Sequence, residues 1–211
     1  MTGRILIDLF TTLDGVAQAP GGPDEDSSGG FRYGGWQAPL FDDVVGQAID
    51  DGMEGMDALL LGRRTYDIFA GFWPHHTEGP DGEIGRLFNA IPKYVASRSE
   101  PVLEWRGSAL LGADLRAEVS GLRRRHSKIH VIGSVNLVQT LLREQLYDEL
   151  NLWVFPVVLG EGKKVFPDGV APSTMRLLAP PVTSETGAVL LKYAPGGPPR
   201  TGDMSREDLG L

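Results

Sequence analysis

Short apolar runs alternate with amphipathic segments through the first 160 residues, and this alternation limits the possible folds more than any other feature of the sequence. Apolar runs typical of buried strands occupy 4–10, 57–62, 93–97, 128–133 and 149–159. Apolar residues at helical spacing occupy 41–56 and the segments after Thr65, Asp114 and Ser134, three residues suited to capping helices. Strands that alternate with helices predict an α/β fold with a mixed, mostly parallel central sheet flanked by helices.

The C-terminal part of the chain departs from this alternation. Runs at 175–178 and 189–193 predict an antiparallel hairpin around Thr186-Gly187 at the edge of the sheet. Residues 195–211 have the composition of a disordered tail, and the Gly- and Pro-rich segment 20–35 that of a mobile surface loop. We therefore expect a single domain over residues 1–194.

Composition narrows the class of protein. The 211 residues carry a formal net charge of -8, which argues against a nucleic acid or an anionic membrane as the partner. No cysteine is present, so disulfides, thiol catalysis and cysteine-based zinc sites are excluded. The adjacent His75 and His76 have no third ligand near them, so we expect no metal site. Without a membrane-spanning apolar run or a signal-peptide pattern, we expect a cytoplasmic protein.

The strongest local motif is Gly62-Arg63-Arg64-Thr65, which joins an apolar strand to a helix. Backbone N–H groups at a helix N-terminus bind phosphate, glycine lets a ligand approach the backbone, and arginines donate to phosphate oxygens. Gly133-Ser134-Val135-Asn136 repeats the strand–turn–helix arrangement without a basic residue. Each turn alone is compatible with an ordinary connection, but two of them in one sheet favour a dinucleotide ligand.

Two further positions are candidates for the same site. Ser97-Arg98 follows a third strand and offers a hydroxyl and a guanidinium for the 2′-phosphate of NADP; the alternative is a solvated strand end. Asp14 ends the first strand, either as a catalytic residue beside the reacting end of the ligand or as a turn-forming residue before Gly15.

In this order, the motifs resemble the dihydrofolate reductase-like proteins related to the C-terminal reductase domain of the bifunctional riboflavin-biosynthesis deaminase–reductase. The resemblance covers roughly residues 4–194 and rests on Thr12-Leu13-Asp14-Gly15, Leu61-Gly62-Arg63-Arg64-Thr65-Tyr66, Lys93-Tyr94-Val95-Ala96-Ser97-Arg98, Ile132-Gly133-Ser134-Val135-Asn136-Leu137, Asp148-Glu149-Leu150 and Pro156-Val157-Val158-Leu159-Gly160-Glu161-Gly162.

The resemblance implies that NADPH lies across the carboxyl edge of the sheet. Residues 62–65 would hold the pyrophosphate and the adenosine phosphate, Ser97 and Arg98 the 2′-phosphate, and 133–137 the pyrophosphate at a helix start. The Asp14-Gly15 turn would face the nicotinamide, and segment 20–35 would close over it. Related proteins are often homodimers packed through their C-terminal strands.

The resemblance leaves the substrate open. The chain lacks the deaminase motifs, and none of Asp42, Asp43, Asp50 and Asp51 is assigned to the acid that folate reductases carry on their first helix. We expect an NADPH-dependent reductase of a small heterocyclic or ribosylamino-pyrimidine-like substrate. The alternatives are a genuine folate reductase and a non-catalytic NADP(H)-binding module.

Two aromatic residues complete the predicted site, and one strand predicts assembly. Trp36, which precedes the first helix, and Phe155 are expected to contact the substrate, although Trp36 could instead anchor the loop. Large apolar residues on both faces of 150–155 predict a homodimer, because a monomeric edge strand could not easily cover both; this region or the closing hairpin is expected near the interface.

Overall fold

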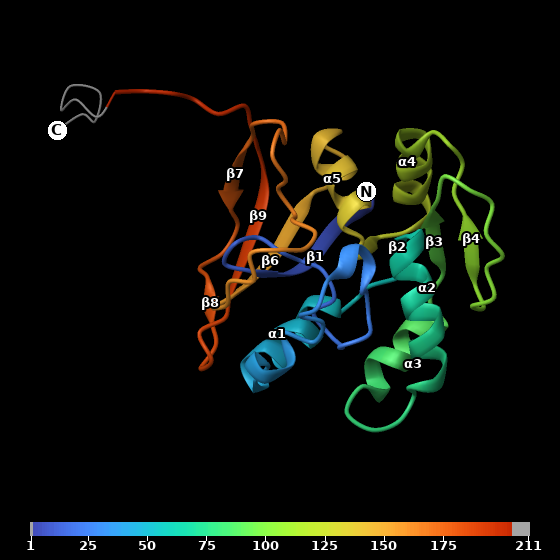
Figure 1. Cartoon of the computed structure of the whole chain (residues 1–211). Helices are drawn as coiled ribbons and strands as arrows, with labels where there is room; N and C mark the ends of the chain where they lie inside the picture. The colour runs from blue at the N-terminus through green and yellow to red at the C-terminus, as the bar shows by residue number, and fades with distance from the viewer. Residues whose placement is uncertain (1, 204–211) are drawn as a thin grey trace.

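The computed structural model describes residues 2–203, whose strands form a nine-stranded sheet (Figure 1). The strands are β1 (Arg4–Thr12), β2 (Ala58–Gly62), β3 (Lys93–Ala96), β4 (Ser108–Leu110), β5 (Lys128–Ile132), β6 (Glu149–Phe155), β7 (Thr174–Leu177), β8 (Val182–Thr183) and β9 (Val189–Gly197). Their order is β4-β3-β2-β5-β1-β6-β9-β7, and β8 pairs with β9. The pairs among β1 to β6 are parallel, whereas β9 is antiparallel to β6, β7 and β8. The predicted mixed, mostly parallel sheet is confirmed.

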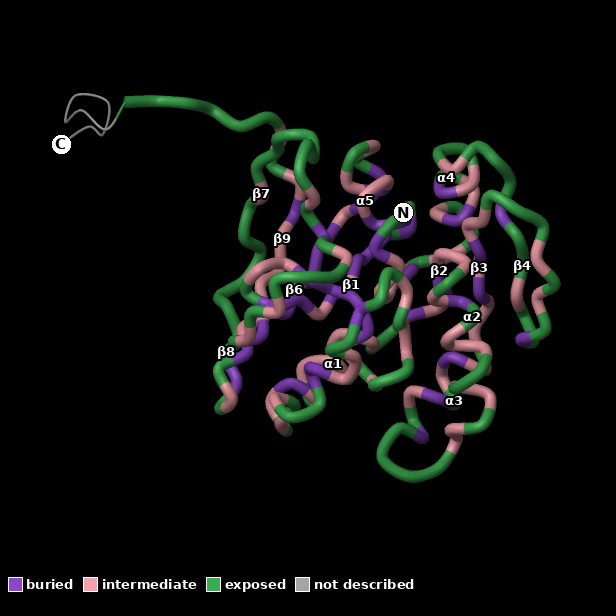
Figure 2. The backbone as a smooth tube through the Cα atoms, viewed as in Figure 1, coloured by how far each residue is buried: buried purple, intermediate pink, exposed green. Residues whose placement is uncertain are grey.

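Helices cover both faces of this sheet. They are α1 (Asp43–Met53), α2 (Arg63–Phe72), α3 (Gly82–Ala90), α4 (Leu115–Arg125) and α5 (Val135–Arg143). Helices α4 and α5 pack on one face in the largest apolar cluster, while α1 packs on the other face and α2 and α3 continue the cover on that side (Figures 1 and 2). No helix among the described residues is long and apolar enough to cross a membrane.

Strand β1 lies inside the sheet, between β5 and β6, and is covered on both faces. This explains why it is a nearly continuous apolar run instead of an alternating one. Ile5, Ile7 and Leu9 belong to the cluster under α4 and α5. Side chains alternate along a strand, so Asp8 and Phe10 point to the opposite face, where α1 lies.

Four details differ from the sequence prediction. The strand expected over 149–159 ends at Phe155, because Pro156 cannot donate to the ladder. The turn at Thr186-Gly187 connects β8 to β9, while the expected partner strand, β7, pairs antiparallel with the later part of β9 along the same edge as β8. Strand β9 continues to Gly197, so residues 195–197 are not tail, and 204–211 lie outside the described residues. Helix α3 and strand β4 were not predicted.

Helix α3 and strand β3 are joined by a buried lysine. The Lys93 side chain is fully buried, and its Nζ donates to the carbonyl oxygen of Phe88 at 2.9 Å, near the C-terminal end of α3. The Nζ also lies 4.4 Å from the centroid of the Trp105 ring, a cation–π contact. Burial, together with the charge of Arg106, lowers the pKa of Lys93 to about 8.

We expect Lys93→Met to change how stability depends on pH. Between about pH 8 and pH 10.5 the unfolded chain still holds this proton while the folded chain has released it, so the unmodified protein becomes more stable as pH rises. The variant lacks this gain, which is at most about 3 kcal/mol. Melting temperatures from pH 7.5 to 10 test the prediction, with the exposed Lys164→Met as control; parallel curves for Lys93→Met and the unmodified protein would contradict it.

Candidate active site

Three adjacent parallel strands bring the predicted cofactor residues to one edge of the sheet. Strands β3, β2 and β5 are neighbours, and Gly62 is the ladder partner of Ala96, which precedes Ser97-Arg98. The carboxyl ends of these strands therefore carry Ser97 and Arg98, then the turn 62–65, then the turn 133–137. The carboxyl edge of a parallel sheet is where α/β folds bind ligands.

Two hydrogen bonds lock the two turns together. The backbone N–H of Gly62 donates to Ser134 Oγ at 2.9 Å, and the backbone N–H of Ser134 donates to Thr65 Oγ1 at 3.0 Å. Thr65 and Ser134 were both expected to cap helices. Ser134 does occupy the N-cap position of α5, but neither side chain forms a capping hydrogen bond, because the two hydroxyls are used between the turns. Thr65 lies inside α2, whose N-cap is Gly62.

The locked turns leave both helix starts without a side-chain cap. Neither Gly62 before α2 nor Ser134 before α5 gives its helix a capping hydrogen bond. Gly133 and Ser134 have φ values of 59° and 58°, a left-handed pair that glycine accommodates easily and serine rarely. A Cβ added to Gly62 would lie 3.4 Å from the Ser134 side chain, so Ser134 already fills the space beside Gly62. Uncapped N–H groups beside such a turn suit the oxyanions of a pyrophosphate, so the residues present fit a dinucleotide.

The three predicted arginines differ in how they are paired. Arg63 Nε donates to both carboxylate oxygens of Asp67, at 2.7 and 2.8 Å. Arg64 donates to Asp26 at 2.6 Å. Arg98 is exposed and has no ion pair with any residue between 2 and 203. Arg98 is therefore the guanidinium of the three that is free to receive a phosphate.

Segment 20–35 is attached to this region through Asp26. Besides Arg64, the Asp26 carboxylate accepts hydrogen bonds from Lys163 Nζ and the Ser28 backbone, and its side chain is 9% exposed. Burial alone would raise the pKa of Asp26, but the bonds from Lys163, Ser28 and Arg64 outweigh it and lower the pKa to about 2. The predicted mobile loop thus has a charged attachment to the turn after β2.

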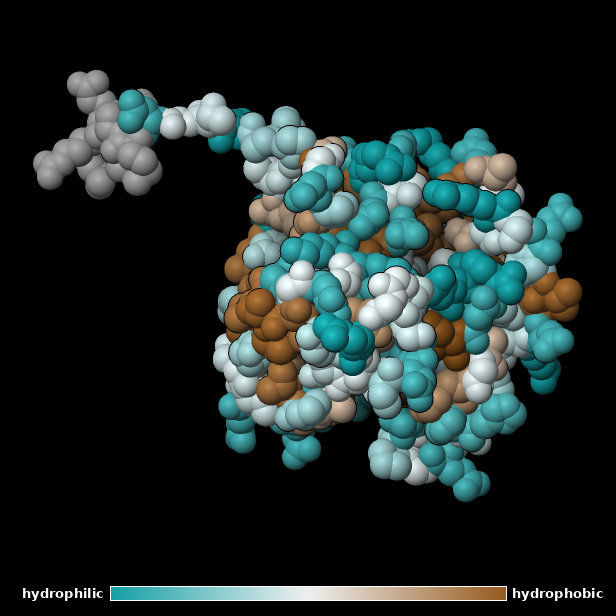
Figure 3. All heavy atoms as spheres, in the orientation of Figure 1, coloured by the Kyte–Doolittle hydropathy of each residue, from teal (hydrophilic) through white to brown (hydrophobic). Residues whose placement is uncertain are grey.

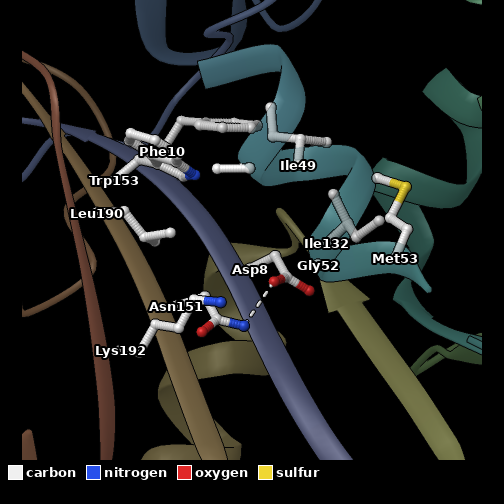
Figure 4. A pocket seen from close by; sticks show the side chains of 11 residues that line it. Asp8, Phe10, Ile49, Gly52, Met53, Ile132, Asn151, Trp153, Leu190 and Lys192 are labelled. Atoms are coloured by element: carbon white, nitrogen blue, oxygen red, sulfur yellow. Dashed lines mark hydrogen bonds between the residues drawn. The ribbon is translucent and has the colours of Figure 1, made fainter. Parts of the chain in front are cut away.

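A groove lies between α1 and the sheet, beside Ile132 (Figure 4). Its empty volume is about 470 Å³ when the solvent at its open mouth is included. Its floor consists of two rows of ladder partners, Asp8–Asn151–Lys192 and Phe10–Trp153–Leu190, on β1, β6 and β9. Its other wall is lined by Ala48, Ile49, Gly52 and Met53 of α1, and Ile132 of β5 closes the side next to Gly133.

Two side chains hold the Asp8 carboxylate in this groove. His130 Nδ1 lies 2.6 Å from Asp8 Oδ2, and Asn151 Nδ2 donates to Asp8 Oδ1 at 2.9 Å. The His130 side chain is 1% exposed, and Asp8 is 26% exposed. Within the part of the chain that the structure describes, His130 Nε2 and Asn151 Oδ1 are buried without a hydrogen-bond partner.

Helix α1 is fixed at both ends, which keeps the groove in shape. At its start, Asp42 accepts from the Val45 N–H at 3.0 Å and from the Thr186 N–H, in the turn before β9, at 3.2 Å. At its end, Lys128 Nζ donates to the carbonyl oxygens of Gly52 and Glu54, both at 2.7 Å.

The remaining predicted site residues have structural contacts. Asp14 accepts from Thr12 Oγ1 and from the N–H groups of Leu159 and Gly160, and the Thr12 bond contributes most to lowering its pKa. This geometry favours the turn-forming alternative for Asp14. Phe155 is fully buried and offers no surface to a ligand, so its expected substrate contact is not present. Trp36 is 8% exposed, donates to the Gln18 carbonyl at 2.8 Å and packs edge-on against Phe155, which supports the loop-anchoring alternative.

The sequence prediction missed Asp8, His130, Asn151 and Lys192. Each of the first three is a polar residue that interrupts an apolar strand, at Ile5–Phe10, Ile129–Ile132 and Leu150–Leu152. A polar residue at an inward position of a buried strand was the available signal, because buried polar groups require partners.

Comparison with known proteins agrees with this geometry. The model of the RibD C-terminal domain family matches residues 4–186, and the chain belongs to that family. It is 30% identical over 168 residues to the uncharacterized protein YyaP of Bacillus subtilis (strain 168), covering 78% of this chain and 81% of YyaP. A protein from Shewanella sp. PV-4, provisionally assigned to riboflavin biosynthesis, superposes with a TM-score of 0.69 at 20% identity, covering 92% of this chain and 99% of that one. Dihydrofolate reductase from Enterococcus faecalis, complexed with NADP(H), gives 0.57 at 15% identity, covering 92% and 98%. The fold is that of dihydrofolate reductase.

We expect Asp26→Asn to destabilise the protein by about 2 kcal/mol at neutral pH, because the variant has no carboxylate to form these ion pairs. The size follows from the pKa of Asp26, which is about 2 in the folded protein and 3.8 in the unfolded chain. The contribution is complete above pH 3.8 and is lost as pH falls through the folded-state pKa. The difference in melting temperature between the unmodified protein and the variant should therefore shrink from pH 6 to pH 2.5. The exposed neighbour Asp24→Asn is the control, and a difference independent of pH would refute this role for Asp26.

Proposed function

We propose that the protein is an NADPH-dependent reductase of a small planar heterocyclic or ribosylamino-pyrimidine-like substrate. The observation that carries the proposal is the pair of locked, uncapped helix starts beside a groove that contains a fixed carboxylate. Membership of the RibD C-terminal family supports the same class of activity.

Each part of the site has a distinct role in this proposal. NADPH, when bound, supplies a hydride. Residues 62–65 and 133–137 hold its pyrophosphate through backbone N–H groups, and Ser97 and Arg98 hold its 2′-phosphate. Phe10, Trp153 and Leu190 hold the substrate ring against α1 and exclude water from one of its faces. Asp8 orients the ring by accepting hydrogen bonds from it.

The activity is tested by following NADPH oxidation through the absorbance of the reduced nicotinamide, with a panel of planar heterocycles that includes dihydrofolate. Protection against heat by NADPH measures cofactor binding separately, because a ligand at 100 times its Kd adds about 2.7 kcal/mol. Binding without turnover of any substrate would favour a non-catalytic NADP(H)-binding module, and turnover of dihydrofolate alone would favour a folate reductase.

We expect Arg98→Gln to weaken NADPH binding roughly tenfold to a hundredfold and to leave NADH binding almost unchanged, because a charged hydrogen bond to the 2′-phosphate contributes about 1.5–3 kcal/mol. Arg63→Gln should have a smaller effect, since Asp67 already occupies that guanidinium. Titration of both cofactors measures this, with the exposed Arg176→Gln on β7 as control. Equal affinity of the unmodified protein for NADPH and NADH would contradict the assignment.

We also propose a homodimer, although for a different reason from the one the sequence suggested. Strand β6 is interior, between β1 and β9, so its two apolar faces are covered within one chain. Instead, Leu177, Leu178 and Val182, in and beside β7 and β8, are 43%, 38% and 37% exposed. Figure 3 shows hydrophobic side chains gathered on the side of the molecule where these strands lie.

Light scattering at micromolar concentration should therefore give twice the 22.8 kDa mass of the chain. Leu177→Lys should shift the protein toward the monomer, because a charge on a paired apolar surface must be desolvated. A single 22.8 kDa species for the unmodified protein would rule out the dimer.

A further inference from the structure

The polar row on the floor of the groove has a negative group at one end, a neutral amide in the middle and a positive group at the other end. Asp8, Asn151 and Lys192 are successive ladder partners on β1, β6 and β9, and all three line the groove. Neighbouring strands lie about 4.8 Å apart, so the strand positions of Asp8 and Lys192 are roughly 10 Å apart. The row therefore runs from an anion through an amide to a cation over the length of a single ring with its substituents (Figure 4).

The Asp8 end accepts hydrogen bonds. An ionised carboxylate is an acceptor only, so the proton shared with His130 belongs to His130 Nδ1. His130 Nε2 is buried without a partner, so a hydrogen on it would have no acceptor. The neutral imidazole, which carries its only N–H on Nδ1, therefore fits these surroundings. Asn151 uses its N–H₂ group on Asp8, which leaves its buried Oδ1 as a second acceptor without a donor.

The Lys192 end donates hydrogen bonds. The Lys192 side chain is half-buried and forms no hydrogen bond or ion pair with any other described residue. Lys128, the other lysine near Asp8, uses its Nζ at the C-terminal end of α1. Lys192 is thus the cation in the groove that remains available to a ligand.

The apolar row fixes the shape of the ligand. Phe10, Trp153 and Leu190 lie beside the polar row, facing Ile49 and Met53 across the groove (Figure 4). A flat ring fits between an aromatic strand surface and a helix fixed at both ends.

We propose that this groove selects planar, dipolar rings. An N–H-donating or cationic edge of the ring binds Asp8, and an acceptor or anionic substituent on the far side binds Lys192. His130 is a positioning residue that holds the Asp8 carboxylate. The inference deepens the proposed function, because it names the substrate class for the same groove, but the recognition itself does not require the cofactor.

Three small planar probes separate the two ends of the row: benzamidine carries the cation alone, benzoate the anion alone, and 4-amidinobenzoate both. Calorimetry or ligand-observed NMR measures their affinities for the full chain. We expect 4-amidinobenzoate to bind at least tenfold more tightly than either single-ended probe. Asp8→Asn should weaken benzamidine and 4-amidinobenzoate roughly tenfold and leave benzoate unchanged, while Lys192→Gln should weaken benzoate and 4-amidinobenzoate and leave benzamidine unchanged.

Matched controls are the exposed Asp50→Asn and Lys164→Gln, neither of which lines the groove. If Asp8→Asn fails to fold, the Lys192→Gln arm still decides the proposal. Nitrogen-15 NMR of His130 should show the neutral Nδ1–H form, with a shift on addition of benzamidine and none with benzoate.

Benzamidine affinity that survives Asp8→Asn, or benzoate affinity that survives Lys192→Gln, would overturn the proposal. So would three probes of equal affinity. If the three probes bind as expected but NADPH does not bind, the reductase assignment is overturned and this inference stands. If NADPH binds but the probes do not show the expected affinities, this inference is overturned and the reductase assignment stands.

Discussion

The site depends on the pair of hydrogen bonds that joins Gly62, Thr65 and Ser134 across two strand ends. Parallel pairing brings the ends of β2 and β5 to one edge, but it does not fix the turns that follow them. The two hydroxyl groups do this. Ser134 Oγ is used between the turns and does not cap α5, and the N-cap of α2 is Gly62, which has no side chain to cap it. Both helix starts therefore offer free N–H groups to an anion.

A second constraint acts inside the sheet, where Asp8, His130 and Asn151 break the apolar character of three adjacent strands. Burying such groups without partners is costly, and here they satisfy one another while leaving two buried atoms unpaired. Proteins depart from good packing rules mainly where function requires it. The phosphate edge and the polar row meet at β5, because Ile132 lines the groove and Gly133 follows it directly.

The sequence was sufficient to predict the parallel sheet, four of the five helices and the three turns at its carboxyl edge, since each depends on local periodicity or turn chemistry. It did not reveal that Asp8 meets His130 and Asn151, because those pairs are separated by 122 and 143 residues and form only after the strands are ordered. Helix α3 was missed because Gly82 and Gly85 lower its helix propensity. Gly85 is needed there, since a Cβ would lie 1.7 Å from the His76 carbonyl oxygen.

Segment 20–35 contacts both the turn after β2 and the apolar cluster beside the groove, which its composition alone does not suggest. Asp26 attaches the segment to Arg64, in the turn after β2, while Phe31 and Trp36 bury it in the cluster that also contains Trp153 of the groove. Any anion that reaches the turn therefore meets a guanidinium already bound to a carboxylate. Because an anion at that turn and the Asp26 carboxylate would share the charge of one guanidinium, the charge at the turn and the attachment of the segment are energetically linked, even though the aromatic anchors keep the segment on the body of the protein.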